Sequence, residues 1–429
     1  MRIFIFFIIL FLSNGVIKAQ HVITLDQSLK AANAYSKAIK NGELGIRSAE
    51  AGVQSAKSYY LPSVSGLALG LYGFKDIIPP IPSLLDKGIN NVYTLGVTAT
   101  QSIYAGGKIL TSNQLAVLKL QASKILARQS ADSVLLLTEQ KYWNIVNLQE
   151  QQKTIRANEE LLNSLLKSQK DLLASGLIAK NDLLRVKVQL SQLLVNKSKL
   201  DNGRMLALFD FSVYTGLPYD SLMVMQDTLN KTKRPTLPAS KADTTLSNLY
   251  SYQLLALDVK SNALQTRLEK ASNLPSLSVG LSASQAGSFN GAFKSSFLPI
   301  GFATLSIPLS ENLWGSNRQK IKQRKISERV SQNNFNDGRN QLQVNIMKYW
   351  YDLKDALTQI DYANDNLIQA SENLKINRDN YKAGLNSISD VLDAQASYQQ
   401  AETTLNTSFT DYQVKLAAYH FVTGKINSR

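Results

Sequence analysis

The chain has 429 residues, no cysteine and two histidines, and its formal net charge at pH 7 is +15. The lack of cysteine excludes disulfides, thiolate metal ligands and a cysteine nucleophile. The lysines and arginines are scattered among glutamine, asparagine and serine, so the positive charge indicates a solvated surface rather than a nucleic-acid site. Neither histidine neighbours a plausible serine–aspartate system, and an enzyme, a cofactor or a metal site is not expected.

Residues 1–19 are typical of a secretory signal peptide. Arg2 supplies the positive start, and the apolar run that follows it, 3–12, is too short to span a membrane as a helix. Ala19 offers a small residue for cleavage, and a short N-terminal anchor is the alternative. No later segment is apolar over ~20 residues, so a membrane crossing by this chain would have to use β-strands.

The remainder of the chain is a two-fold repeat. Residues 176–184 match residues 384–392, which lie 208 positions later, and three upstream pairs of motifs recur in the same order. Between the halves, a stretch with three prolines is typical of an irregular linker. We therefore predict a first repeat at 20–217 and a second repeat at 245–429. The linker between them, 218–244, is expected near the middle of the helical bundle.

Each repeat is expected to run helix, strand, strand, long helix, turn, helix. Proline-free stretches with apolar residues three and four apart predict the helices. They are 25–59, 108–173 and 181–213 in the first repeat, and 245–272, 312–381 and 388–422 in the second. In each repeat the two shorter helices together are about as long as the long one. This match predicts a uniform coiled bundle in which pairs of short helices pack beside a long helix.

Strands are expected at about 61–75, 91–105, 274–286 and 298–310. Within them, 93–100 and 277–284 alternate apolar residues with serine, threonine and glycine. One polar and one apolar face suit strands between a water-filled lumen and lipid, although a half-buried soluble sandwich is the alternative. Four strands interrupted by long helices cannot close a sheet alone, so strands from other copies are expected to complete an oligomeric barrel.

Three signatures resemble the TolC-like outer membrane efflux protein family, over nearly all of the chain after the signal. They are Tyr60-Leu61-Pro62-Ser63-Val64 with its partner Asn273-Leu274-Pro275-Ser276-Leu277, then Gln101-Ser102-Ile103-Tyr104-Ala105-Gly106-Gly107-Lys108, and Tyr381-Lys382-Ala383-Gly384 followed by Ser389-Asp390-Val391-Leu392-Asp393-Ala394-Gln395. The resemblance implies a mainly α fold with a small β part. A long α-helical coiled-coil barrel is joined to four strands per protomer, which contribute to a trimeric twelve-stranded outer-membrane β-barrel.

The resemblance also implies the outer-membrane exit duct of a tripartite efflux or type I secretion system, extending into the periplasm. Its expected partners are two further copies, outer-membrane lipid, a periplasmic adaptor (membrane fusion protein) and an inner-membrane transporter. Small molecules, drugs, metal ions and proteins all remain open as cargo. The competing hypothesis is a periplasmic coiled-coil scaffold or adaptor without a channel, which would not need two equivalent halves or alternating strands.

In this family the turns at the helical tip close the periplasmic entrance, and the resemblance assigns pore residues there. Asp390 and Asp393 match a pair of aspartates that line the constriction. They are three residues apart near a helix start, so they share a face, and three copies would place six carboxylates around one axis. The alternative for Asp390 is a helix N-cap, and both roles can hold together.

The resemblance also assigns a latch that holds the closed state. Asp182 and Tyr381 match an aspartate and a tyrosine that are bonded to each other in the family. A well-known member has an arginine in this latch, where the present chain has the uncharged Asn386, and whether the latch works without that arginine is left open. Gly176 and Gly384 are expected to form the turns at the periplasmic tip, at positive φ.

Overall fold

The computed structural model describes residues 22–83, 87–231, 233–292 and 294–426, so the predicted signal peptide lies outside the described residues. The chain forms two compact units, each of which draws on both repeats. The first contains the described residues up to Lys40, Gln129–Leu249 and the residues from Leu342 onward. The second contains Asn41–Arg128 and Tyr250–Gln341.

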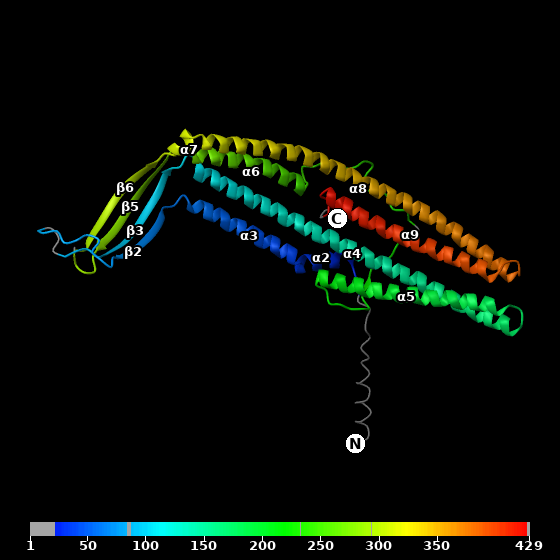
Figure 1. The fold of residues 1–429 in the computed structure, drawn as a ribbon. Coiled ribbons are helices and arrows are strands. Elements are labelled where there is room, and N and C mark those ends of the chain that lie inside the picture. Colours follow the sequence, from blue (N-terminus) through cyan, green and yellow to red (C-terminus); the bar gives the residue numbers. More distant parts are fainter. Residues whose placement is uncertain (1–21, 84–86, 232, 293, 427–429) are drawn as a thin grey trace, which may run out of the picture. The chain divides into compact units, whose positions relative to one another are not determined.

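The second unit contains one antiparallel sheet, to which each repeat contributes a hairpin (Figure 1). The strands follow one another in the order β2 (Ser63–Tyr72), β3 (Asn91–Tyr104), β5 (Ser276–Gly287) and β6 (Ser296–Ser306). The two hairpins meet where β3 pairs with β5, and β2 and β6 form the edges. The sheet is therefore continuous across the repeats and open at both sides.

The two central strands separate apolar from hydroxyl side chains. Val97 in β3 and Leu281 in β5 are both largely exposed. Thr98 and Ser282 are paired across the strands, and their hydroxyl oxygens lie 3.1 Å apart on the opposite face. The edge strands separate them less cleanly, because Leu67 of β2 falls on the hydroxyl-bearing face. The alternation predicted from the sequence thus holds best in the middle of the sheet.

A pair of glycines carries the chain from β3 into the long helix α4 (Lys108–Ala174). Gly106 and Gly107 have φ of 59° and 85°, which side chains other than glycine rarely adopt. A Cβ on Gly106 would lie 2.7 Å from the carbonyl oxygen of Ala271, near the end of α6 (Tyr250–Ser272). The signature at this passage therefore reflects a backbone requirement.

Three predicted helices differ from the structure by more than two residues at one end or are broken within their length. The helix expected at 25–59 is divided into α2 (Leu25–Tyr35) and α3 (Lys37–Ser58). Ser36 breaks it with ψ near 125°, and its hydroxyl accepts a hydrogen bond from the backbone N–H of Ile39, at the start of α3. Serine at such a boundary is favourable because it supplies a partner for an unpaired helix N–H.

The second long helix, α8 (Ser316–Lys382), begins four residues after the predicted start. Gly315, at φ 76°, separates it from a short helix, α7 (Leu309–Leu313). The start of α6 is also later than predicted. The side chain of Asp243 accepts a hydrogen bond from the N–H of Thr245, and this local turn competes with helical hydrogen bonding.

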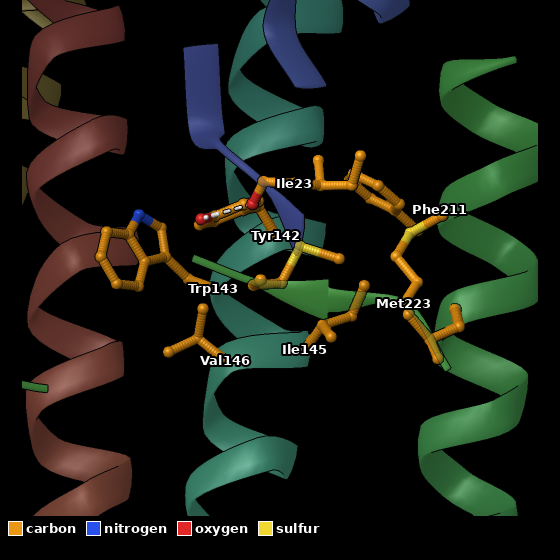
Figure 2. Packing of buried hydrophobic residues seen from close by; sticks show 9 residues of the cluster. Ile23, Tyr142, Trp143, Ile145, Val146, Phe211 and Met223 are labelled. Atoms are coloured by element: carbon orange, nitrogen blue, oxygen red, sulfur yellow. Dashed lines mark hydrogen bonds between the residues drawn. The ribbon is translucent and has the colours of Figure 1, made fainter. Parts of the chain in front are cut away.

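The first unit is built on α2, α5 (Lys180–Thr215), α9 (Ile388–Val422) and the adjoining parts of α4 and α8. It also contains a short parallel pair, β1 (Val22–Ile23) and β4 (Val224–Met225). Figure 2 shows its apolar cluster, in which side chains of α4 lie against α5 and this strand pair. The cluster consists of Ile23, Tyr142, Trp143, Ile145, Val146, Leu208, Phe211, Met223 and Met225.

The predicted linker is bound to the helices of the first unit by side chains. Arg234 makes two hydrogen bonds to the carboxylate of Asp361 in α8, at 2.6 and 2.7 Å. Lys425, beyond α9, lies 2.7 Å from the carboxylate of Asp243. This lysine, together with hydrogen bonds from Thr245, lowers the pKa of Asp243 from 3.8 to about 2. Among the described helices, none has an apolar stretch long enough to cross a membrane.

Candidate functional site

The two helical turns of the first unit have the same backbone design. Gly176 follows α4 and Gly384 follows α8, with φ of 69° and 74°. At each turn the glycine N–H and the next N–H bond back to carbonyls of the preceding helix: Gly176 to Leu173, Leu177 to Leu172, Gly384 to Tyr381 and Leu385 to Asn380. This pattern is the Schellman motif, which ends a helix on a left-handed residue and satisfies its last carbonyls.

Both turns lie next to one apolar cluster. Side chains from α4, α5 and α9 form it: Leu162, Val186, Leu193, Ile388, Val391 and Leu392. The ring of Tyr381, three residues before the turn glycine of α8, packs against its edge. Since residues of both repeats share the cluster, it fixes the two helical hairpins to each other near their turns.

Asp390 and Asp393 are both exposed, one turn apart on α9. The N-cap of this helix is Ser387, so the alternative of Asp390 as the N-cap is wrong by three positions. Asp390 is instead the acidic partner in a capping box: its carboxylate accepts from the backbone N–H of Ser387 at 2.9 Å and from its hydroxyl at 2.7 Å. These hydrogen bonds lower the pKa of Asp390 below its usual value, so the carboxylate is charged at neutral pH.

The expected latch residues lie at the same turns. The hydroxyl of Tyr381 accepts a 2.6 Å hydrogen bond from the side-chain amide of Gln169 in α4. Asp182 is the third residue of α5 and is half-buried. Within the described part of this single protomer, no hydrogen bond joins Asp182 to Tyr381, so that pairing stays a prediction.

Two further contacts surround the turns. Asn386 donates a 2.7 Å hydrogen bond to Asn377 of α8, and so holds its own turn rather than the neighbouring hairpin. Arg185 of α5 donates a 3.2 Å hydrogen bond to the hydroxyl of Ser389, which adjoins Asp390. A guanidinium is therefore placed beside the residues assigned to the constriction. In the two-fold repeat Arg185 occupies the position equivalent to Asp393, which by itself gives no sign of this contact.

A polar seam runs from the turns along α4 and α9. Asn158 and Gln399 hydrogen-bond to each other across it. The side-chain oxygens of Asn158 and Gln169 are buried without a hydrogen-bond partner in the described structure. Asn158 also lines a cavity of about 540 Å³ between α4, α8 and α9, together with Arg378 and Glu402. Buried amides and a cavity give this contact less apolar packing than the cluster nearer the turns.

The arrangement of one hairpin and one long helical hairpin per repeat is the fold of outer-membrane channels. The CmeC outer membrane channel of Campylobacter jejuni has a TM-score of 0.79 at 16% identity, covering 94% of this chain and 86% of that chain. VceC of Vibrio cholerae has a TM-score of 0.78 at 15% identity, with 94% and 97% covered. The Neisseria gonorrhoeae MtrE channel has a TM-score of 0.73 at 15% identity, with 94% and 89% covered.

Residues 245–425 match the outer membrane efflux protein family. No curated protein sequence matches the chain. The chain is therefore similar to outer membrane efflux proteins in sequence over its second repeat, and it shares the fold of solved outer-membrane channels over nearly its whole length. The resemblance and the mainly α fold with a small β part, both predicted from the sequence, are confirmed.

Proposed function

We propose that three copies of this chain form the exit duct of a tripartite efflux or secretion system. The duct receives its cargo from an inner-membrane transporter through a periplasmic adaptor and releases it outside the cell. Small molecules, drugs, metal ions and proteins are all compatible with this role. The family match over the second repeat supports the proposal, together with a fold shared with several outer-membrane channels.

The observation that carries the proposal is the four-stranded sheet. Its edge strands β2 and β6 each pair on one side only among the described strands. All ten residues of β2 are exposed, including large apolar side chains. An isolated edge of this kind promotes aggregation. Placing β2 of one copy beside β6 of the next removes every edge, and three copies then give a closed barrel of twelve strands.

Within this assembly, Asp390 and Asp393 are proposed to line the periplasmic constriction, and Asp182 and Tyr381 to hold it closed. Their support is the family motif and their position at the helical turns. The apolar cluster beside the turns gives these residues a fixed frame, because it fixes α4, α5 and α9 to one another there.

Assembly is tested by the mass of detergent-extracted protein. Light scattering should give three times the protomer mass, and insertion into a planar bilayer should give discrete conductance steps. A stable monomer in mild detergent would contradict the proposal.

Since the natural chain has no cysteine, the strand arrangement can be tested by cross-linking. Pairs of cysteines, one in β2 and one in β6, should form intermolecular disulfides at some register. Pairs placed wholly within the central strand β3 are the control and should not. Failure of every β2–β6 pair to cross-link between copies would reject the closed sheet.

A further inference from the structure

The beginning of α8 has a row of exposed positive charges. Arg318, Lys322, Lys325 and Arg329 follow one another at intervals of four, three and four residues, so they share one face of the helix. All four side chains are exposed. At the helical rise, the row is about 16 Å long. We call these four residues the basic stripe.

The packing side of α8 is different. Asn317 and Ser331 are buried, and Arg324 lies between them in sequence with its guanidinium held by α6. It donates a 2.9 Å hydrogen bond to Gln265 and lies 3.9 Å from the carboxylate of Glu269. Arg324 therefore has partners within the unit, whereas the residues of the basic stripe point away from this contact.

The position of the stripe is unfavourable for the helix itself. The first turn of α8 has no acidic residue, and Arg318 stands in it, near the positive end of the helix dipole. The corresponding helix of the first repeat, α4, also has no acidic residue in its first turn and begins with Lys108. Cations at these two helix starts gain nothing from the dipole, so an external anion would relieve the repulsion.

The segment just before the stripe is apolar and exposed. Trp314 is 85% exposed and Leu313 is 76% exposed. Leu309, one helical turn before Leu313 in α7, is also exposed, and Glu311 is the acidic residue in this segment. Tryptophan and leucine followed directly by a row of cations are typical of chains that lie at a membrane–water interface.

The sheet places this segment. Strand β6 ends at Ser306, and α7 begins three residues later. If the sheet spans the outer membrane, α7 and the first turns of α8 lie at its periplasmic surface. Phospholipid phosphates lie at this depth, and basic residues within a Debye length of them, about 8–10 Å, are attracted.

We propose that the basic stripe, with Trp314 beside it, binds anionic phospholipid headgroups in the periplasmic leaflet of the outer membrane. This inference rests on the proposed function, because it takes the sheet as the membrane-spanning part. The stripe would gather anionic lipid around each protomer and fix the depth of the channel. Arg318 and Lys322 lie nearest the sheet in sequence and contribute most, while Arg329 contributes least.

Trp314 provides the signal for a test, because the other two tryptophans, Trp143 and Trp350, are buried. The full protein is placed in vesicles of phosphatidylcholine with phosphatidylglycerol. One of the two lipids is brominated near the carbonyl end of its acyl chains, at the same mole fraction in each case. The measured quantity is quenching of tryptophan fluorescence by the anionic lipid relative to quenching by the zwitterionic lipid. The variant Trp314→Phe gives the background from the buried tryptophans.

In the wild type, quenching by the anionic lipid should be about twice the quenching by the zwitterionic lipid, or more. The triple variant Arg318→Gln, Lys322→Gln, Lys325→Gln should bring it close to one. A matched control removes three exposed cations from α4, with Lys119→Gln, Lys124→Gln and Arg128→Gln, and should keep the wild-type ratio. Raising the salt from about 0.05 to 0.5 M should lower the wild-type ratio, because screening shortens the range of attraction.

Three results would overturn the inference. The first is an equal ratio in the wild type and the triple variant. The second is a triple variant that keeps the wild-type quenching ratio but changes the cation-to-anion permeability of the channel, which would place the stripe in the lumen. The third is a triple variant that keeps the wild-type quenching ratio but no longer binds purified peptidoglycan, which would make the cell-wall polymer the partner of the stripe.

The mass and conductance of the triple variant show whether it still assembles. They also separate this inference from the proposed function. Absence of trimers and conductance in the wild type would reject the channel, whereas an intact channel without anionic-lipid preference rejects only the lipid contact.

Discussion

The side-chain amide of Gln169 donates a 2.6 Å hydrogen bond to the hydroxyl of Tyr381, and so joins the ends of the two long helices α4 and α8. Gln169 is fully buried, and its amide oxygen has no hydrogen-bond partner in the described structure. The hydroxyl of Tyr381 is thus the partner that the structure gives this buried amide. Since the two residues come from different repeats, the bond opposes any separation of the two helical hairpins near their turns.

The first prediction removes this bond. Tyr381→Phe leaves the amide of Gln169 buried without a partner, which destabilises the closed arrangement by about 1–3 kcal/mol. We expect a higher single-channel conductance in a planar bilayer and a lower melting temperature. The double variant Tyr381→Phe with Gln169→Leu replaces both polar groups by apolar ones and should recover most of the stability. Unchanged conductance and melting in Tyr381→Phe would show that the bond has no role in closure.

A second prediction tests the latch that the family motif assigns. If Asp182 bonds to Tyr381 in the assembled channel, Asp182→Asn should raise conductance as Tyr381→Phe does, and combining the two should add little. Additive effects in the double variant would mean that the residues act separately, with Gln169 as the relevant partner. The measurement is the same conductance assay, made on trimers of confirmed mass.

The turn glycines could be predicted from the sequence alone, whereas the hydrogen bond of Gln169 could not. Gly176 and Gly384 stand where a helical pattern stops, and a glycine there predicts a left-handed turn without reference to the rest of the fold. Gln169 lies among the leucines of α4, where Leu162 and Leu166 are its helical neighbours toward the N-terminus. A polar residue in an apolar stripe signals a buried hydrogen bond, but its partner is 212 residues away, and only the packed hairpins identify it.

Helix breaks follow the same division. Gly315 could have been recognised as a helix boundary, since glycine ends helices and a serine follows it. The break at Ser36 has no glycine or proline and depends on a capping hydrogen bond that serine makes only in context. The spacing between Ser387 and Asp390 is that of a capping box, but aspartate is itself a favourable N-cap residue, and the sequence therefore also allows Asp390 at that position.

The third prediction concerns the apolar cluster of the first unit. Phe211 is fully buried there, and Phe211→Ala should destabilise the protein by about 3–5 kcal/mol, because it removes a large side chain and leaves a cavity. Phe209, two residues earlier on α5, is 53% exposed and provides the matched control. Thermal unfolding in detergent should show a large drop for Phe211→Ala and a small one for Phe209→Ala. Equal drops would mean that the cluster does not determine stability.

The fourth prediction concerns pH and the linker. The pKa of Asp243 falls from 3.8 to about 2 because Lys425 stabilises its charged form, and the N–H of Thr245 adds a hydrogen bond. A depressed carboxyl pKa adds stability that is complete above the unfolded pKa, near 4, and is lost as the pH falls toward 2. Asp243→Asn should therefore lower the melting temperature at pH 7 and have little effect near pH 2. Lys425→Gln keeps the turn at Thr245 and should also lower the melting temperature at pH 7 but not near pH 2. If either variant differed from the wild type by the same amount at both pH values, the prediction would be contradicted.

The last prediction concerns the aspartates at the turn of α9. In a trimer, Asp390 and Asp393 place six carboxylates around one axis, and like charges at close range repel unless a cation binds between them. Di- or trivalent cations added from the periplasmic side should then block the pore, and the pore should favour cations over anions.

Substitution tests whether this block depends on charge. Asp390→Asn with Asp393→Asn should remove most of it, and since Ser387 remains the N-cap, the helix start is kept. The control variant, Asp352→Asn with Asp355→Asn, changes two aspartates with the same spacing on α8. Cations should block its pore as they block the wild type. Arg185 adds a second test, because its guanidinium is bonded beside Asp390 and offsets part of the negative charge. Arg185→Gln should therefore strengthen the block. If blocking curves for the aspartate pair, its control and the arginine variant coincide, the carboxylates have no role in the pore, and Asp390 serves only the capping box that the structure shows.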